Sequence, residues 1–128
     1  LASECGAKRA LMLPVSAPFH SVLMQPAADA MRAALADVQL KAPVVPLVAN
    51  VQAEPVSDPD QIKDLLVRQV TGQVRWRETV SWFAANGVTD IVEVGSGKVL
   101  TGLARRIDRS LSGTAINTPR DIETYLQQ

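Results

Sequence analysis

The single histidine of this 128-residue chain, His20, is the side chain best suited to acid–base chemistry. Histidine is the residue type whose proton ordinarily exchanges near physiological pH. A histidine that acts as a general base also needs a partner that orients it and a nucleophile to deprotonate. The chain offers Gln69 as a possible partner and no nucleophile motif, so chemistry alone favours a structural role for His20.

Gln69 lies on the apolar stripe of a predicted helix, in line with Ile62, Leu65, Leu66 and Val70. A polar amide in a row of buried positions needs a hydrogen-bond partner. Fraying at the helix end or an internal hydrogen bond would satisfy it, and the spacing favours this explanation. The alternative is that the amide faces a polar site.

Residues 95–98, with the sequence Gly-Ser-Gly-Lys, lie between a predicted strand and a predicted helix. Anions bind to α/β proteins at such helix N-termini. The segment lacks the glycines of a dinucleotide fingerprint or a P-loop, and Ser96 lacks those of a nucleophile elbow. A tight turn that uses the conformational freedom of glycine is therefore favoured over an anion site.

The helix that follows carries three basic side chains on one face, Lys98, Arg105 and Arg109, at about 100° per residue. The opposite face is predicted to hold Val99, Leu103 and Ile107. A solvated surface is the simplest interpretation, since late arginines also suit the helix dipole. The alternative is a docking surface for an acidic partner or a phosphate.

The composition indicates one ordinary globular domain, with 47% hydrophobic and 20% charged residues. Thirteen basic side chains balance thirteen acidic ones, which argues against nucleic-acid binding through a whole-domain basic field. We expect no membrane span, no metal site and no disulfide, since Cys5 is the only cysteine. With no signal peptide pattern, these features are typical of a cytoplasmic protein.

Strands are predicted over residues 8–15, 43–51, 88–94 and 114–117, with a turn at 54–55. Helices are predicted to begin at Pro26, Pro59, Trp76, Lys98 and Pro119. This alternation favours an α/β fold with parallel strand pairing. Residues 1–6 resemble the last turn of a helix that ends at Gly6, with Cys5 packed at its end, so we expect the chain to be part of a longer protein.

Several sequence blocks resemble the malonyl-CoA:acyl carrier protein transacylases of bacterial fatty-acid synthesis. The blocks are residues 13–21 (Leu-Pro-Val-Ser-Ala-Pro-Phe-His-Ser), 26–28, 50–51, 66–70, 74–76 and 93–103. Ser96 stands where that family usually has proline. The resemblance implies an α/β fold made of the end of a ferredoxin-like small subdomain (1–16) and the C-terminal portion of an α/β-hydrolase-like large subdomain (17–128).

The resemblance also assigns roles to residues. His20 is implied to be the general base, and Gln69 is implied to support it, with the imidazole as partner of its amide. Phe19 and Asn50 are assigned to substrate binding. Phe19 is associated with malonyl rather than branched units, because an aromatic ring there would crowd a methyl branch.

The family transfers a malonyl group from malonyl-CoA to the phosphopantetheine thiol of acyl carrier protein through an acyl-serine, with no further cofactor. That serine, the oxyanion hole and the arginine that holds the malonyl carboxylate belong to an N-terminal part outside these 128 residues. We therefore expect this chain alone to be inactive and to need the missing part. The alternatives are a non-enzymatic module that binds a carrier protein through its basic face, and an anion-binding α/β fragment.

Overall fold

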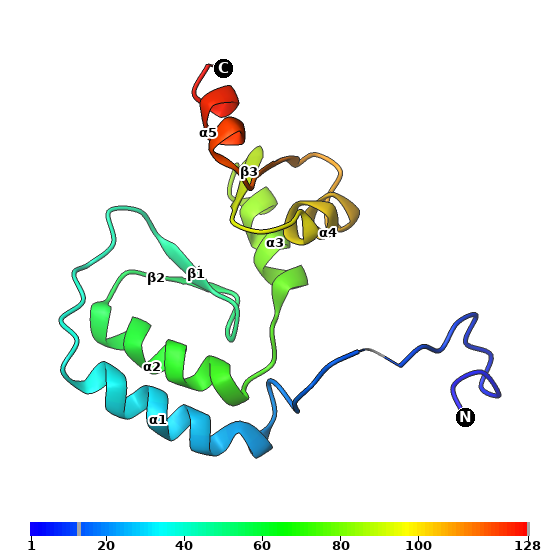
Figure 1. The fold of residues 1–128 in the computed structure, drawn as a ribbon, viewed down its shortest axis with the longest axis horizontal. Helices are drawn as coiled ribbons and strands as arrows, with labels where there is room; N and C mark the ends of the chain where they lie inside the picture. Colours follow the sequence, from blue (N-terminus) through cyan, green and yellow to red (C-terminus); the bar gives the residue numbers. More distant parts are fainter. Residues whose placement is uncertain (13, 128) are drawn as a thin grey trace.

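The computed structural model describes residues 1–12 and 14–127, whose helices and strands form two successive packed groups (Figure 1). The first group consists of the 3₁₀ helix η1 (Val22–Met24), α1 (Gln25–Ala36), β1 (Leu47–Ala49), β2 (Glu54–Val56) and α2 (Pro59–Thr71). The second consists of α3 (Trp76–Ala85), β3 (Asp90–Val94), α4 (Val99–Ile107), β4 (Ser112–Ile116) and α5 (Pro119–Tyr125).

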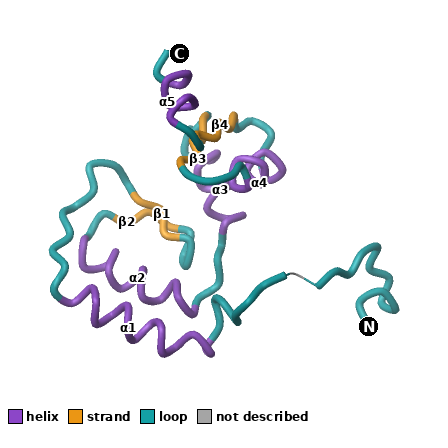
Figure 2. Tube along the Cα trace, in the orientation of Figure 1, coloured by secondary structure: helices purple, strands orange, loops and turns teal. Residues whose placement is uncertain are grey.

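In the first group, α2 lies between α1 and the hairpin formed by β1 and β2 (Figure 2). Val56, Ile62 and Leu65 are buried together where the hairpin covers α2. Val67 is also buried, and it lines the boundary with α1. The helix therefore buries two faces, one against the hairpin and one against α1.

The β1–β2 pair corrects two expectations. The strands are antiparallel, with Leu47 opposite Val56, because a connection this short cannot return a strand in the parallel direction. Residues 54–55 belong to β2 rather than to a turn, since Pro55 is tolerated in a strand with an open edge. The turn lies at residues 50–53, where Ala53 adopts a left-handed φ of 58°.

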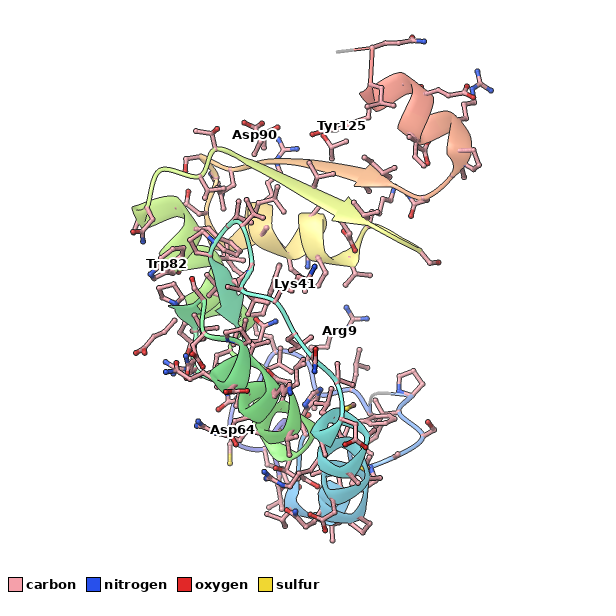
Figure 3. The ribbon with its side chains drawn as sticks, turned by 90° about the vertical axis from the view of Figure 1, so that its left-hand side faces the viewer. Arg9, Lys41, Asp64, Trp82, Asp90 and Tyr125 are labelled. Atoms are coloured by element: carbon pink, nitrogen blue, oxygen red, sulfur yellow. The ribbon has the colours of Figure 1, made fainter. Side chains whose placement is uncertain are left out.

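The second group confirms the predicted parallel pairing, because β3 and β4 run in the same direction with Val94 opposite Ile116. Figure 3 shows α4 along one face of this pair. Val80 of α3, Ala104 of α4 and Leu111 form the core between them, and Val80 is fully buried. Burial of this apolar surface is the main force that holds the group together.

The face of α4 that packs on the strands differs from the predicted one. Thr101 and Ala104 are buried, whereas Val99 and Leu103 are exposed. Small side chains are needed there because the helix comes close to β4: a Cβ added to Gly113 would lie 3.0 Å from Cβ of Thr101. The basic face is consequently beside the buried face rather than opposite to it.

Two helix starts follow the predicted capping chemistry. Asp58 precedes α2 and accepts a hydrogen bond from the backbone N–H of Gln61 at 2.8 Å. Thr118 precedes α5 and forms a reciprocal capping box with Asp121. Both motifs satisfy N–H groups that lack partners within the helix, so these boundaries are readable from sequence.

The N-terminal turn ends as expected, but the segment after it does not form a strand. Gly6 has a φ of 86°, and the N–H of Ala7 donates to the carbonyl of Ala2 at 3.0 Å, which closes a helix-terminating turn. The strand predicted over 8–15 is wrong for its described residues; position 13 lies outside them. Cys5 is exposed, so its predicted packing role is also wrong.

The β3–β4 pair presents apolar surface away from α4. Val92 and Val94 are exposed on the side of the pair that α4 leaves uncovered, and Val94 is 78% exposed. Parallel sheets are usually covered on both faces. Within residues 1–12 and 14–127, no helix combines the length and the apolar character that crossing a membrane requires.

Candidate active site

His20 lies on a tight turn that leads into η1. The hydroxyl of Ser21 donates to the carbonyl of Pro18 at 2.8 Å and accepts from the N–H of Leu23 at 3.3 Å, so it caps the short helix. His20 itself has a φ of 58°, in the left-handed region that residues other than glycine rarely adopt. Such a conformation costs about 1–3 kcal/mol, and strained residues of this kind cluster at functional sites.

The imidazole of His20 contacts the end of α2, 49 residues further along the chain. Its Nδ1 atom lies 2.9 Å from the backbone carbonyl oxygen of Gln69. A carbonyl oxygen can only accept, so this contact places a hydrogen on Nδ1 of the neutral ring. Nε2 then carries the free lone pair that a general base requires.

The predicted partnership between His20 and Gln69 is therefore present, but the predicted group is wrong. The side-chain amide of Gln69 donates instead to the carbonyls of Gly72, at 3.3 Å, and Gln73, at 3.4 Å. The backbone carbonyl is available because α2 ends at Thr71, and the last four carbonyls of a helix lack intrahelical donors. The helix-ending Gly72 was the sequence signal that could have indicated this acceptor.

The two residues assigned to substrate binding lie in different surroundings. Phe19 adjoins His20 and is 56% exposed, so its ring is free to line a site beside the imidazole. Asn50 lies in the β1–β2 turn, where its Oδ1 accepts a hydrogen bond from the buried hydroxyl of Thr79 at 3.0 Å. The contact of Asn50 that the structure shows ties the hairpin to α3, and its assignment to substrate stays a prediction.

The N-terminus of α4, the candidate anion site, is filled by a side chain of this chain. Glu93 accepts hydrogen bonds from the N–H of Thr101 at 2.9 Å, from the Thr101 hydroxyl at 3.0 Å and from the N–H of Leu100 at 3.2 Å. These bonds, that of the Thr101 N–H foremost, hold the pKa of Glu93 below its ordinary value of 4.5. Because the carboxylate takes the place an anion would occupy, the geometry disfavours the anion-binding alternative.

Acidification should destabilise the protein partly through Glu93. A lowered folded-state pKa stabilises the fold fully above 4.5, and that stabilisation is lost as the pH falls through the lowered value. Glu93→Gln keeps an acceptor oxygen without the charge, so the variant should unfold at a lower temperature at neutral pH. The unfolding temperature of the variant should also fall less on acidification than that of the wild type. Thermal scans from neutral pH to below 4.5 would measure both. Equal acid sensitivity of variant and wild type would contradict this assignment.

Comparison with known proteins finds relatives over nearly the whole chain. The malonyl CoA-acyl carrier protein transacylase of Salmonella typhimurium is 48% identical over 123 residues, which are 96% of this chain and 40% of that protein. The crystal structure of an acyl-carrier-protein-S-malonyltransferase from Bartonella henselae matches with a TM-score of 0.89 and 60% identity, over 98% of this chain and 40% of that one.

This chain belongs to the malonyl CoA-acyl carrier protein transacylase family. A malonyl-transacylase solved in complex with a type II PKS acyl-carrier protein also matches, with a TM-score of 0.87, 42% identity and coverage of 98% and 40%. No protein-family model matches the sequence. The chain spans about 40% of the length of these relatives. The predicted family and α/β fold class are confirmed, and the predicted subdomain boundary at residue 16 stays a prediction.

The chain also contains a basic pocket of about 620 Å³ between α4 and the start of β4. Lys98, Arg105 and Arg109 line it together with the hydroxyl-bearing Ser110 and Ser112. The three cations therefore do share one surface, as predicted, and the close approach of α4 to β4 makes that surface concave. Of the lining residues that the structure describes, none is acidic.

Proposed function

We propose that this chain is the C-terminal portion of an enzyme that transfers malonyl groups from malonyl-CoA to the phosphopantetheine thiol of acyl carrier protein. The contact between His20 Nδ1 and the Gln69 carbonyl carries the proposal, since it leaves Nε2 free to act as a base. The names of the relatives supply the substrates. Transfer of labelled malonyl to holo acyl carrier protein by the full-length protein tests it, and no transfer by the wild type would overturn it.

In the proposed reaction, His20 Nε2 takes the proton of a serine hydroxyl as that oxygen attacks the malonyl thioester. The C–S bond to CoA breaks, the imidazolium returns its proton to the CoA thiolate, and a malonyl-serine ester remains. The carrier thiol then gives its proton to Nε2 and attacks the ester, and the serine oxygen recovers that proton. The serine comes from the part of the relatives that this chain does not span.

The carbonyl acceptor suits this cycle. Gln69 lies in the last turn of α2, where the helix dipole places partial negative charge. That charge favours the imidazolium formed each time His20 takes a proton. No carboxylate partner is then needed, although a carboxylate would stabilise the imidazolium more strongly.

The exposed surface supports the proposed need for the remainder of the enzyme. Val92 and Val94 lie on an uncovered face of a parallel strand pair, and Phe19 is exposed beside His20. We expect these side chains to be covered by the additional sequence that the relatives contain. We also expect this chain alone to form no acyl adduct with malonyl-CoA, which mass spectrometry of the isolated chain would check.

Phe19 is proposed to select malonyl over branched units, because it is exposed and directly precedes in sequence the base that the acyl group must approach. Overpacking a fitted site by a methyl group costs about 1–3 kcal/mol. Competition between malonyl-CoA and methylmalonyl-CoA for the wild-type enzyme measures this selectivity. Equal use of the two substrates would contradict it.

Carrier docking is a second role that the geometry favours. Lys98, Arg105 and Arg109 line one pocket, and such a concentration of positive charge attracts an acidic partner. Replacing Lys98 and Arg105 by glutamate should lower kcat/KM for the carrier by about 10-fold or more through lost electrostatic steering. Steady-state transfer at varied carrier concentration measures this effect.

The matched control for charge reversal is Arg120→Glu, which changes an exposed arginine on α5 outside the pocket. It should leave kcat/KM for the carrier near the wild-type value. Acylation by malonyl-CoA alone should be unchanged in all of these variants. If the pocket variants match the control, the basic face is a solvated surface and the docking proposal fails.

A further inference from the structure

The C-terminal end of α2 is packed so closely that it has no room for a side chain at Gly72. The N–H of Gly72 donates to the carbonyl of Arg68 at 2.8 Å and ends the helix. A Cβ atom added to Gly72 would lie 2.7 Å from Cγ2 of Val51 and 2.8 Å from the carbonyl oxygen of Arg68. Both distances are shorter than non-bonded atoms tolerate, and one of the obstructing atoms is backbone.

The obstructing hairpin turn is itself anchored from the opposite side. Arg75 donates from its backbone N–H to the carbonyl of Asn50 at 2.9 Å, and from Nη1 to the carbonyl of Gln52 at 2.9 Å. The hydroxyl of Thr79, which is 1% exposed, donates to Oδ1 of Asn50. Because the turn is held to α3, Val51 cannot simply move away from a larger residue at position 72.

The side chain of Gln69 completes the arrangement. Its amide bridges the carbonyls of Gly72 and Gln73, the first residues beyond the helix. The same residue presents its backbone carbonyl to His20 at 2.9 Å. The carbonyl carbon of Arg68 is bonded to the backbone nitrogen of Gln69. A Cβ atom at position 72 that displaces the Arg68 carbonyl would therefore also displace the backbone of Gln69.

We propose that Gly72 is a positioning residue for catalysis: its missing side chain lets α2 end against the β1–β2 turn and keeps the Gln69 carbonyl aimed at Nδ1 of His20. The inference rests on the proposed function, in which His20 is the base. It concerns how the base is oriented, so it can fail while the proposed function stands.

The test uses Gly72→Ala in the full-length enzyme and measures the acylation step with malonyl-CoA. When the Gln69 carbonyl is displaced, the imidazole of His20 is held less firmly, and the tautomer with hydrogen on Nε2 becomes accessible. Misplacement of a catalytic group by about 1 Å costs about 10²-fold in rate, so we expect kcat for acylation to fall about 10- to 100-fold. KM for malonyl-CoA should change little, since the role proposed for Gly72 is to orient the base rather than to bind substrate.

The tautomer of His20, read by NMR, distinguishes a loss of imidazole orientation from a general loss of stability. In ¹⁵N-histidine-labelled enzyme, the His20 resonances, identified by their loss in His20→Ala, should report hydrogen on Nδ1 of the neutral ring. In Gly72→Ala they should report a mixture of the two tautomers. A variant that is only less stable would keep the wild-type tautomer in its folded fraction.

Gly102→Ala is the matched control, because it adds the same methyl group where no atom lies within 4 Å apart from its chain neighbours and the backbone of its own helix. It should leave acylation and the His20 tautomer unchanged. Val51→Ala in the Gly72→Ala background removes one obstruction and should restore part of the rate. If Gly72→Ala does not fold, Gln69→Leu removes the amide bridge and should show the same loss in kcat and the same tautomer mixture.

The outcomes are distinguishable. Wild-type kcat and tautomer in Gly72→Ala, or in Gln69→Leu where that variant is needed, overturn the positioning role even if His20→Ala is inactive. Full acylation by His20→Ala overturns the proposed role of His20 as base, whereas no malonyl transfer by the wild type overturns the proposed function itself. If kcat for acylation falls as much in Gly102→Ala as in Gly72→Ala, the enzyme is sensitive to an added methyl group in general. That result also overturns the positioning role.

Discussion

Replacing His20 with alanine in the full-length protein should slow malonyl transfer by about 10²–10⁴-fold, the usual contribution of a positioned general base. Nε2 is the only imidazole nitrogen free to accept a proton, because Nδ1 is committed to the Gln69 carbonyl. Both half-reactions need this atom, so acylation by malonyl-CoA and transfer to the carrier should fall together. Single-turnover assays with labelled malonyl-CoA measure each step separately.

A companion variant removes the base without disturbing the turn. His20 has a left-handed φ of 58°, a conformation that asparagine adopts more readily than alanine does. His20→Asn should therefore fold as the wild type does and be as inactive as His20→Ala. Wild-type transfer by His20→Asn would remove His20 from the chemistry and overturn its proposed role as general base.

Replacing Leu65 with alanine should lower the free energy of unfolding by about 2–5 kcal/mol, the usual range for a large apolar side chain removed from a core. Leu65 is 5% exposed and lies with Val56 and Ile62 between α2 and the hairpin. The cavity would weaken the contact that holds α2 against the β1–β2 turn. Denaturant unfolding of the full-length protein measures the change.

Gln61→Ala is the control for Leu65, because Gln61 is an exposed residue on the same helix. Its truncation leaves the backbone N–H that Asp58 caps in place, so stability should change by no more than about 0.5 kcal/mol. An equally small loss for Leu65→Ala would show that the core between hairpin and helix is not where the structure places it.

Local sequence signals predicted much of the secondary structure, because their causes are local. Asp58 and Thr118 start helices through hydrogen bonds to N–H groups within the same turn, and Gly6 ends a turn through its own positive φ. The strand candidate over residues 8–15 failed, since a strand requires a partner strand and its described residues have none. The sequence predicted the strand that contains β1 but missed β2, because Pro55 indicated a turn there.

The sequence by itself determined the family resemblance and the helix boundaries at Asp58 and Thr118, and that resemblance implied the pairing of His20 with Gln69. Only the tertiary structure decided that the backbone carbonyl of Gln69, rather than its amide, meets the imidazole. The physical reason is that the position of the Gln69 carbonyl oxygen depends on where α2 ends against the β1–β2 turn. A sequence pattern identifies side chains, but a carbonyl without a donor exists at a defined place only after helix, turn and histidine loop have packed together.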